Sequence, residues 1–322
     1  METIATMVEF ADIEAAYERI KDSVTKTPVM TSTTIDALAD SEVFFKCENF
    51  QRVGAFKFRG ALNAVSLLSQ KEREKGVITH SSGNHAQALA LASSKRGVRC
   101  TVVMPSSSPA VKMEATKGYG AEVVVCEPTL ASRQRTAAAL IEKHGYTLIH
   151  PYDNPNIIAG AGTAAFELIK EVGSLDAIFA PVGGGGLLSG TSIATKGLLP
   201  KADVIAGEPK GADDAYRSFT TGKILPSVNP STIADGLLTS LSELTFSIIQ
   251  QNVDRIVTVS DQEIVKAMRL LWERMKVVVE PSGAVSLAAL LQICEQLKGR
   301  RIGVILSGGN VDLERFFSQY RV

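Results

Sequence analysis

Short apolar runs alternate with longer segments of helical periodicity along almost the whole chain, and this alternation limits the possible folds more than any other feature. Most runs are rich in Val and Ile and apolar on both faces, as in parallel strands covered by helices. The pattern therefore predicts an α/β fold with parallel sheets. We expect strands at Val43 to Cys47, Val77 to Thr79, Cys100 to Met104, Glu122 to Cys126, Thr147 to His150, Ala177 to Pro181, Val204 to Gly207, Arg255 to Val259 and Ile302 to Leu306. We expect helices at Ala86 to Arg96, Ser132 to His144, Gly162 to Val172, Glu263 to Met275 and Ala284 to Leu297.

The 322 residues are enough for about two domains of ordinary size. The block from Val77 to Thr147 contains three strand–helix units of its own. We therefore expect a small domain, residues 76–149, inserted in a large domain formed by residues 1–75 and 150–322. A cleft between two such domains is where ligands of open α/β sheets bind, so we expect the active site there.

Charge and cysteine content exclude several classes of protein. Lys plus Arg number 34, and so do Asp plus Glu, which argues against binding to nucleic acid or to an anionic membrane. No apolar run approaches the roughly 18 residues of a membrane span, and the first ten residues lack a signal-peptide pattern, so a cytoplasmic protein is expected. The four scattered cysteines form no metal-binding motif, which favours reduced thiols over a zinc site. They are Cys47, Cys100, Cys126 and Cys294.

Lys57 lies between two phenylalanines in the segment GAFKFRGALNAV, just before a helical pattern. Burial disfavours the charged form of an amine and so lowers its pKa. A neutral amine is what imine formation with an aldehyde cofactor requires. The alternative is a surface lysine whose ammonium group stays in water.

The segment SSGNHAQAL follows the expected strand at Val77 to Thr79. Small polar residues and a glycine at a strand-to-helix turn expose backbone N–H groups that can bind an anion such as a substrate carboxylate. Ser81 belongs to this turn, Ser82 can act as an acid or base, and Asn84 can donate to a cofactor hydroxyl. His85 is expected to be structural rather than catalytic, although it lies within the same substrate-binding turn. The alternative is ordinary helix capping by Ser81 or Asn84.

Four consecutive glycines, Gly183, Gly184, Gly185 and Gly186, follow another apolar strand in PVGGGGLLSG. Ordering four glycines costs backbone entropy, so packing alone rarely explains such a run. A backbone without side chains can close around a phosphate at a helix N-terminus. The segment lacks the GK[ST] and GxGxxG patterns of nucleotide sites, which favours a monophosphate. A flexible turn is the alternative.

Ser307 begins the segment SGGNVD at the carboxyl end of the expected strand Ile302 to Leu306. A side chain in this position points into the cleft where ligands of open α/β sheets bind. A hydroxyl facing a pyridine nitrogen leaves that nitrogen largely unprotonated. A simple turn into the last helix is the alternative.

Together these four segments resemble the fold-type II pyridoxal 5′-phosphate (PLP) enzymes, the tryptophan synthase β-like fold. More narrowly, they resemble the serine racemase and serine/threonine dehydratase group, over nearly the whole chain from Thr27 to SGGNVDLERF. The resemblance implies two parallel-sheet α/β domains with the active site between them. It also implies a homodimer that acts on a small amino-acid substrate.

The resemblance assigns roles to residues at matching positions. Lys57 would form the Schiff base with PLP, and Ser82 would be the acid/base on the opposite face. The remaining cofactor contacts would be Phe56 beside the ring, Asn84 on the ring hydroxyl, Gly183 to Gly186 on the phosphate, Ser307 at the pyridine nitrogen and Gly236, in TIADG, at a cofactor-contacting turn.

A fifth segment, GEPKGADDA, predicts a divalent cation site. Glu208 and Asp214 lie six residues apart with the carbonyl of Ala212 between them. Carboxylates, a carbonyl and waters form the all-oxygen shell that magnesium or calcium prefers. Two acids in a loop are usually just solvated. Racemase-like members of the family, however, bind an activating Mg²⁺ (or Ca²⁺ or Mn²⁺) at this position.

The resemblance implies serine racemisation together with dehydration of β-hydroxy amino acids, because α-proton removal precedes both. A threo-3-hydroxy-L-aspartate ammonia-lyase and a catabolic L-threonine/L-serine dehydratase stay open as alternatives. From a different class, a β-replacement synthase or a non-catalytic PLP-binding protein is also considered. The retained lysine argues against the non-catalytic alternative, and FKFRG, Ser307 and the metal loop argue against a synthase.

The segment LASRQRTAAAL bears on the choice of substrate. It reads as a helix start with Ser132 as candidate cap, and Arg133 and Arg135 cannot share one helical face. Arg133, in the first turn, is the expected partner for the distal carboxylate of a diacid such as 3-hydroxyaspartate. A solvated surface arginine is the alternative.

Overall fold

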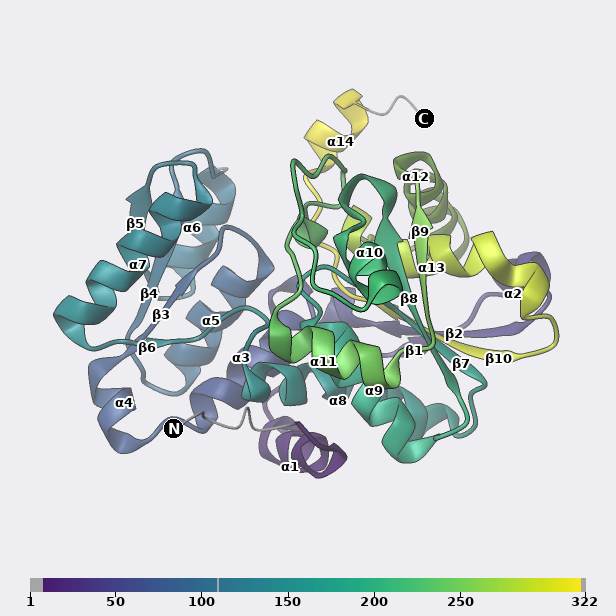
Figure 1. The fold of residues 1–322 in the computed structure, drawn as a ribbon, viewed down its shortest axis with the longest axis horizontal. Helices are drawn as coiled ribbons and strands as arrows, with labels where there is room; N and C mark the ends of the chain where they lie inside the picture. Colours follow the sequence, from purple (N-terminus) through teal and green to yellow (C-terminus); the bar gives the residue numbers. More distant parts are fainter. Residues whose placement is uncertain (1–7, 109, 320–322) are drawn as a thin grey trace.

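The computed structural model describes residues 8–108 and 110–319 and contains two β-sheets (Figure 1). All strand pairs in them are parallel except the pair of β1 with β2. This arrangement confirms the predicted α/β class. The first sheet has six strands in the order β1 (Val29–Met30), β2 (Glu42–Cys47), β10 (Arg301–Leu306), β7 (Ala177–Pro181), β8 (Asp203–Pro209) and β9 (Arg255–Val259). The second has four strands in the order β5 (Glu122–Cys126), β4 (Cys100–Pro105), β3 (Val77–His80) and β6 (Thr147–Leu148).

Helices cover both faces of the six-stranded sheet, which explains why its central strands are apolar on both sides. On one face α12 and α13 bury residues such as Ile264 and Leu287. On the other face α8, α9 and α11 bury Ile158, Leu188 and Ile249. The helices around this sheet are α1 (Phe10–Ile20), α2 (Thr33–Ala39), α8 (Pro155–Val172), α9 (Gly186–Leu198), α10 (Asp214–Thr221), α11 (Glu243–Asn252), α12 (Asp261–Leu270), α13 (Pro281–Ile293) and α14 (Leu313–Gln319).

The four-stranded sheet, on the left of Figure 1, also lies between helices. Val102 packs in the apolar cluster with α5 and α3, whereas the next residue, Val103, packs in the cluster with α7. Successive side chains of a strand point to opposite faces of the sheet, so this alternation shows that β4 contacts helices on both faces. The helices here are α3 (Lys57–Ser66), α4 (Gln70–Lys75), α5 (Asn84–Lys95), α6 (Ala110–Gly118) and α7 (Leu130–His144). The sheet is built entirely from residues 77–148, and the exact domain boundaries stay a prediction.

Several helix boundaries differ from the sequence prediction. The helix expected from Gly162 begins at Pro155, because the Asn154 side chain caps it by accepting from the N–H groups of Asn156 and Ile157. Gly160 interrupts the helical pattern in the sequence, so this earlier start was not predicted. A Cβ there would lie 2.7 Å from the carbonyl oxygen of Arg59, so the glycine permits the close contact of α8 with α3.

Two other predicted helices are interrupted near their C-terminal ends. The segment expected to run to Met275 is α-helical only to Leu270 and continues as a π-helical turn, after which Lys276 takes a left-handed conformation with φ 63°. The segment expected to run to Leu297 leaves α-helical geometry after Ile293 and ends in a 3₁₀ turn. Among the described residues, no helix is long and apolar enough to cross a membrane.

Candidate active site

The four segments singled out in the sequence meet at the carboxyl ends of strands from both sheets. Phe56 donates its backbone N–H to the carbonyl of Ser307 over 3.0 Å, which joins the lysine segment to the turn after β10. The side chain of Asn310, in that turn, donates to the Asn84 side chain at the start of α5 over 2.9 Å. The glycine run follows β7, which is hydrogen-bonded to β10 in the same sheet. Segments far apart in the sequence thus form one site.

Lys57 is the first residue of α3, and its side chain is partly buried. Its Nζ donates to the carbonyl of Pro151 over 2.9 Å and lies 5.1 Å from the centre of the Phe56 ring. Burial lowers the pKa of Lys57 to about 8, partly opposed by the negative charge of Glu280. A substantial fraction of the amine is therefore neutral near physiological pH, which is the form that attacks an aldehyde.

Two residues beyond Lys57, a buried network of four charges anchors the start of α3. Arg59 is fully buried and donates to Glu48 over 2.7 Å and to Glu167 over 2.8 Å. Lys46, on β2, also donates to Glu167 over 2.8 Å. Two cations thus balance two anions, and the network ties α3 to β2 and α8. Sequence analysis did not find it.

Asn84 is the first residue of α5, and Gly83 occupies the capping position without a side chain. Helix capping by Asn84 is therefore excluded, because its amide makes tertiary contacts instead. Its Nδ2 donates to Oε1 of Glu280 over 2.9 Å. Ser81 and Ser82 precede it and are partly buried. A Cβ on Gly83 would meet no atom within 4 Å, so open space lies beside this turn.

The histidines around the lysine are held neutral. His85 is 2% exposed, with its Nε2 3.1 Å from the carbonyl oxygen of Ile149, and burial lowers its pKa to about 3. Burial also lowers the pKa of His150 to about 4. His80 packs edge-on against His150, and burial followed by the charge of Arg133 lowers its pKa. This burial favours the structural interpretation of the His85 ring.

The glycine run forms a buried turn into α9 in which no position has room for a side chain. A Cβ on Gly184 would lie 2.3 Å from the Tyr152 ring, and one on Gly183 would lie 2.9 Å from Cα of Leu237. Gly185 also has φ 88°, a conformation that side chains disfavour, and Gly186 faces Tyr152. The turn leads directly into the first N–H groups of α9, which have no partner within the helix. The alternative of a flexible turn conflicts with this packing.

Two further predicted cofactor contacts flank the glycine run. Gly236 lies in a 3₁₀ turn, and its N–H donates to the Ser282 hydroxyl over 3.0 Å. Its N–H is therefore already occupied, whereas its carbonyl lies on the side of Gly183. Ser307 directly follows β10 and is 4% exposed, and its place beside the cofactor ring stays a prediction.

The predicted metal loop runs from Glu208, near the end of β8, to Asp214, the first residue of α10, and both carboxylates are buried. Glu208 accepts from the N–H groups of Ala215 and Tyr216, each over 2.8 Å. Asp214 is 1% exposed, and its Oδ2 is buried without a hydrogen-bond partner. Burial raises the pKa of Glu208 to about 8 and that of Asp214 to about 6. Ala212 closes the 3₁₀ turn between them.

This donor set fits a hard divalent cation. It combines two carboxylates with a nearby backbone carbonyl, and a cation would supply the missing partner of Asp214 Oδ2. Within residues 8–108 and 110–319, no group of three or more His, Cys, Asp or Glu side chains is arranged to hold a metal. A cation here would therefore need the Ala212 carbonyl and waters to complete its shell.

Arg133 and Arg135 lie on different faces of α7. The helix begins at Leu130, and its cap is Thr129, whose side chain accepts from the N–H of Ser132. The prediction of Ser132 as cap was wrong, because the helix starts two residues earlier than its apolar pattern indicated. Arg133 is partly buried, its Nε has no partner, and its charge acts on His80 at the end of β3. Arg135 is exposed.

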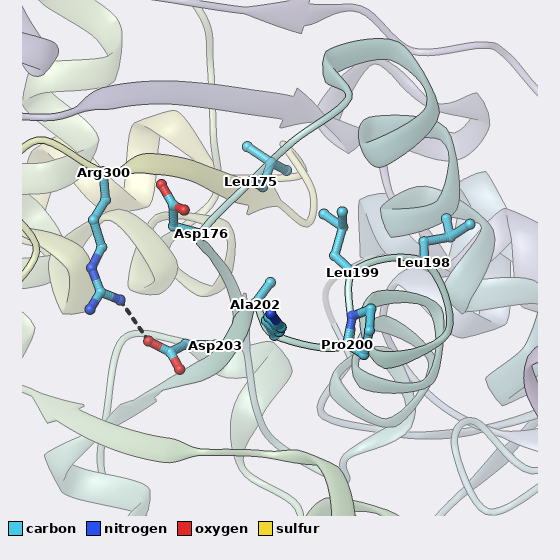
Figure 2. A pocket seen from close by; sticks show the side chains of 9 residues that line it. Leu175, Asp176, Leu198, Leu199, Pro200, Ala202, Asp203 and Arg300 are labelled. Atoms are coloured by element: carbon cyan, nitrogen blue, oxygen red, sulfur yellow. Dashed lines mark hydrogen bonds and ion pairs between the residues drawn. The ribbon is translucent and has the colours of Figure 1, made fainter.

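A cavity of about 590 Å³ lies at the opposite end of the large sheet (Figure 2). It is lined by the loops that precede β7, β8 and β10, with Arg300 paired to Asp203 over 2.7 Å. None of the predicted site residues lines it. Ligands of parallel sheets bind at the carboxyl ends of strands, so this cavity is not part of the candidate site.

Sequence analysis missed several residues that contact the predicted ones. Among them are Glu280 and Asn310, which bind Asn84, and Tyr152, which packs on the glycine run. Glu280 carried a usable signal, since it is an acid between the apolar run Val277 to Val279 and the helix start at Pro281. Asn310 belongs to the SGGNVD segment, which was singled out for Ser307 only, and Tyr152 stands in a polar loop without a comparable signal.

Comparison with known proteins gives full-length matches. Residues 20–308 match the family described as "Pyridoxal-phosphate dependent enzyme". The chain is 52% identical over 317 residues to a serine racemase of Dictyostelium discoideum, covering 97% of this chain and 98% of the relative. It is 51% identical to an L-threo-3-hydroxyaspartate ammonia-lyase of Saccharomyces cerevisiae, covering 95% and 94%. The crystal structure of the Dictyostelium serine racemase superposes with a TM-score of 0.92 over 95% of this chain and 99% of that one.

Proposed function

This chain belongs to the family of pyridoxal-phosphate-dependent enzymes, and on that premise we propose that it racemises serine and also eliminates ammonia from β-hydroxy amino acids. One observation carries the proposal. Relatives named for each of the two activities match nearly the whole chain at about half identity. Both activities begin with removal of the α-proton, so a single site can perform them.

The residues of the site fit the cofactor. The lowered pKa of Lys57 suits covalent attachment of the cofactor aldehyde. The Gly183 to Gly186 turn has room for backbone only and meets the helix N-terminus that favours a phosphate. We assign Phe56 to the face of the cofactor ring, Asn84 to the ring hydroxyl and Ser307 to the pyridine nitrogen. We assign the turn at Gly236, on the side of its carbonyl, to contact with the same cofactor. When bound, the cofactor delocalises the negative charge that the departing α-proton leaves behind.

We assign proton transfer to Lys57 and Ser82. With a substrate amino acid held in the site, a neutral Nζ of Lys57 would accept the α-proton on one face. The Ser82 hydroxyl can then deliver a proton on the opposite face, and this two-sided transfer inverts the α-carbon. Loss of a β-hydroxyl needs proton removal on one face only. The same pair therefore supports racemisation and elimination in different proportions.

We assign a structural divalent cation, Mg²⁺ with Ca²⁺ or Mn²⁺ as alternatives, to Glu208, Asp214 and the Ala212 carbonyl. The unpartnered Oδ2 of Asp214 supports this assignment. The metal loop begins at Glu208 in β8, and the preceding residue, Gly207, accepts from the N–H of Val182, just before the glycine run. A cation would thus order the loop beside the proposed phosphate turn. A homodimer, implied by the family resemblance, and a cytoplasmic location, expected from the sequence pattern, stay predictions.

Arg133 supports a second candidate function, elimination from 3-hydroxyaspartate. The residue is partly buried, its Nε is buried without a partner, and its charge acts on His80, just before the serine turn. A second substrate carboxylate would supply a bidentate partner there. His85 and Ser81 would lie in the same turn, with their backbone N–H groups toward the α-carboxylate.

An assay panel distinguishes these candidates. The purified enzyme is incubated with L-serine, D-serine, L-threonine or 3-hydroxyaspartate, and keto acid and both serine enantiomers are measured. We expect D-serine and pyruvate from L-serine. Arg133→Ala should lose roughly tenfold or more, about 1.4 kcal/mol, in kcat/KM on the diacid but not on serine.

Other outcomes of the panel identify the alternatives. Equal effects of Arg133→Ala on both substrates would remove Arg133 from the substrate site. Product formed only when a thiol is added would indicate a β-replacement synthase. A cofactor-loaded protein without any turnover would indicate a non-catalytic binding protein.

A further inference from the structure

Glu280 is a buried acid at the centre of the site that the proposed chemistry does not use. It precedes α13 and is 5% exposed, and its backbone N–H donates to the Gly308 carbonyl over 3.0 Å. Its side chain does not cap its own helix. Instead the carboxylate points at Asn84, from a position 196 residues away in the chain.

Hydrogen bonds fix both ends of the Asn84 amide. Nδ2 of Asn84 donates to Oε1 of Glu280 over 2.9 Å. At the other end, Oδ1 of Asn84 accepts from Nδ2 of Asn310, which also donates to the Val53 carbonyl over 2.7 Å. Both N–H groups of Asn310 are thus used, and a flipped Asn84 would face donor with donor. The observed orientation satisfies all three residues and leaves one N–H of Asn84 unused.

The turn after β10 packs closely against the carboxyl group of Glu280. A Cβ on Gly308 would lie 2.6 Å from Glu280 Oε1, so the turn after β10 must carry glycine there. The charged groups that act on Glu280 are Asp235 and Lys112, and Glu280 in turn acts on Lys57. Burial raises the pKa of Glu280 to about 8.

We propose that Glu280 is a positioning residue, which orients the Asn84 amide so that its remaining N–H is available to the cofactor's ring hydroxyl. This inference rests on the proposed function in one respect, the assignment of Asn84 to that hydroxyl. Without Glu280, the amide of Asn84 loses the acceptor that fixes its donor end. The cofactor then loses a preorganised hydrogen bond rather than a direct contact with Glu280.

A double-mutant cycle on cofactor binding tests the proposal. The dissociation constant of PLP and the absorbance band of the bound cofactor are measured for wild type, Glu280→Ala, Asn84→Ala and the double variant. We expect each single variant to weaken binding about tenfold, about 1.4 kcal/mol. We expect the double variant to be no weaker than the singles, because both remove the same hydrogen bond. Additive losses, or an unchanged Glu280→Ala, would overturn the proposal.

Three further variants separate orientation from charge and from folding. Glu280→Gln keeps an acceptor for Asn84 without the charge, and we expect its PLP affinity to stay within about threefold of wild type. A Gln variant as weak as the Ala variant would overturn the proposal. Asn310→Ala should weaken PLP binding although Glu280 itself is unchanged. Unchanged PLP binding in this variant would also overturn the proposal. Glu295→Ala, at an exposed carboxylate, is the matched control, and thermal unfolding of each apoprotein checks folding.

Failure of this inference and failure of the proposed function are distinguishable. If the wild-type protein does not attach PLP through Lys57, the proposed function fails before any variant is made. If wild type binds PLP and racemises serine while the cycle is additive, only the role of Glu280 is wrong.

Discussion

At the scale of single residues, sequence analysis singled out residues in segments of unusual composition. It missed residues whose role depends on contacts with distant parts of the chain. The segments of Lys57 and of the glycine run were singled out for their composition, and the family resemblance then assigned their roles. The contacts of Glu280 and Asn310 with Asn84 were not predicted, since they join residues 196 and 226 positions apart. Local periodicity contains no information on such pairs.

The pKa of Lys57 gives a pH-dependent prediction. Burial places it at about 8 instead of 10.5, and only the neutral amine attacks the cofactor aldehyde. The rate of PLP attachment to the apoenzyme should therefore rise with pH, with a midpoint near 8, and then level off. Stopped-flow absorbance measures this rate. A midpoint near 10 would mean that the amine is solvated, and Lys57→Ala should show no attachment and no turnover.

Ser82 gives a prediction on the ratio of two activities. Ser82→Ala should lose at least tenfold more racemisation than dehydration of L-serine, because only racemisation needs a proton donor on the second face. Chiral chromatography and a pyruvate assay on the same samples measure both. Equal loss of the two activities would show that Ser82 only positions the substrate, and Ser81→Ala is the neighbouring control.

At the scale of elements, the order of strands and helices followed from hydrophobic periodicity, whereas their ends did not. The start of α8 depends on the Asn154 cap, and the close packing of α3 on α8 depends on Gly160, which reads as a helix breaker in the sequence. The cap of α7 fell on Thr129 rather than Ser132, since the polar run from Ser132 to Arg135 separates Leu130 from the apolar part of the helix. Element ends depend on caps and tertiary contacts that periodicity does not report.

The buried charges behind α3 give a prediction on stability. Arg59→Met should destabilise the protein by about 3–5 kcal/mol, because it leaves Glu48 and Glu167 with too little positive charge in the interior. Urea unfolding of the apoprotein measures this loss. Arg269→Met, which breaks an exposed pair with Glu273, is the control and should cost less than about 1 kcal/mol. Similar losses in both variants would contradict the anchoring role of the network.

At the scale of the whole molecule, the parallel sheets bring the ends of strands from both halves of the chain to one place. The sequence predicted this arrangement because the alternation of strands and helices permits few topologies. It could not place the metal loop next to the glycine run, since that proximity depends on β8 pairing with β7. Sheet order is a property of the assembled fold.

The proposed cation links the site to global stability. Magnesium at about a hundred times its dissociation constant should raise the unfolding free energy by about 2.7 kcal/mol, because it binds only the folded protein. Thermal unfolding with chelator and with magnesium measures the difference. Asp214→Ala should abolish it, whereas Asp213→Ala, at the neighbouring partly exposed acid, should not. A wild-type protein that is indifferent to magnesium would remove Glu208, Ala212 and Asp214 from the site.

The central claim is that one site moves the α-proton of serine on both faces. Its most direct test is proton NMR of L-serine incubated with the PLP-loaded enzyme in deuterium oxide, followed by separation of the enantiomers. The account predicts deuterium at the α-carbon of D-serine, with pyruvate accumulating in the same sample. L-serine that keeps its α-proton, with no D-serine and no pyruvate formed, would contradict it.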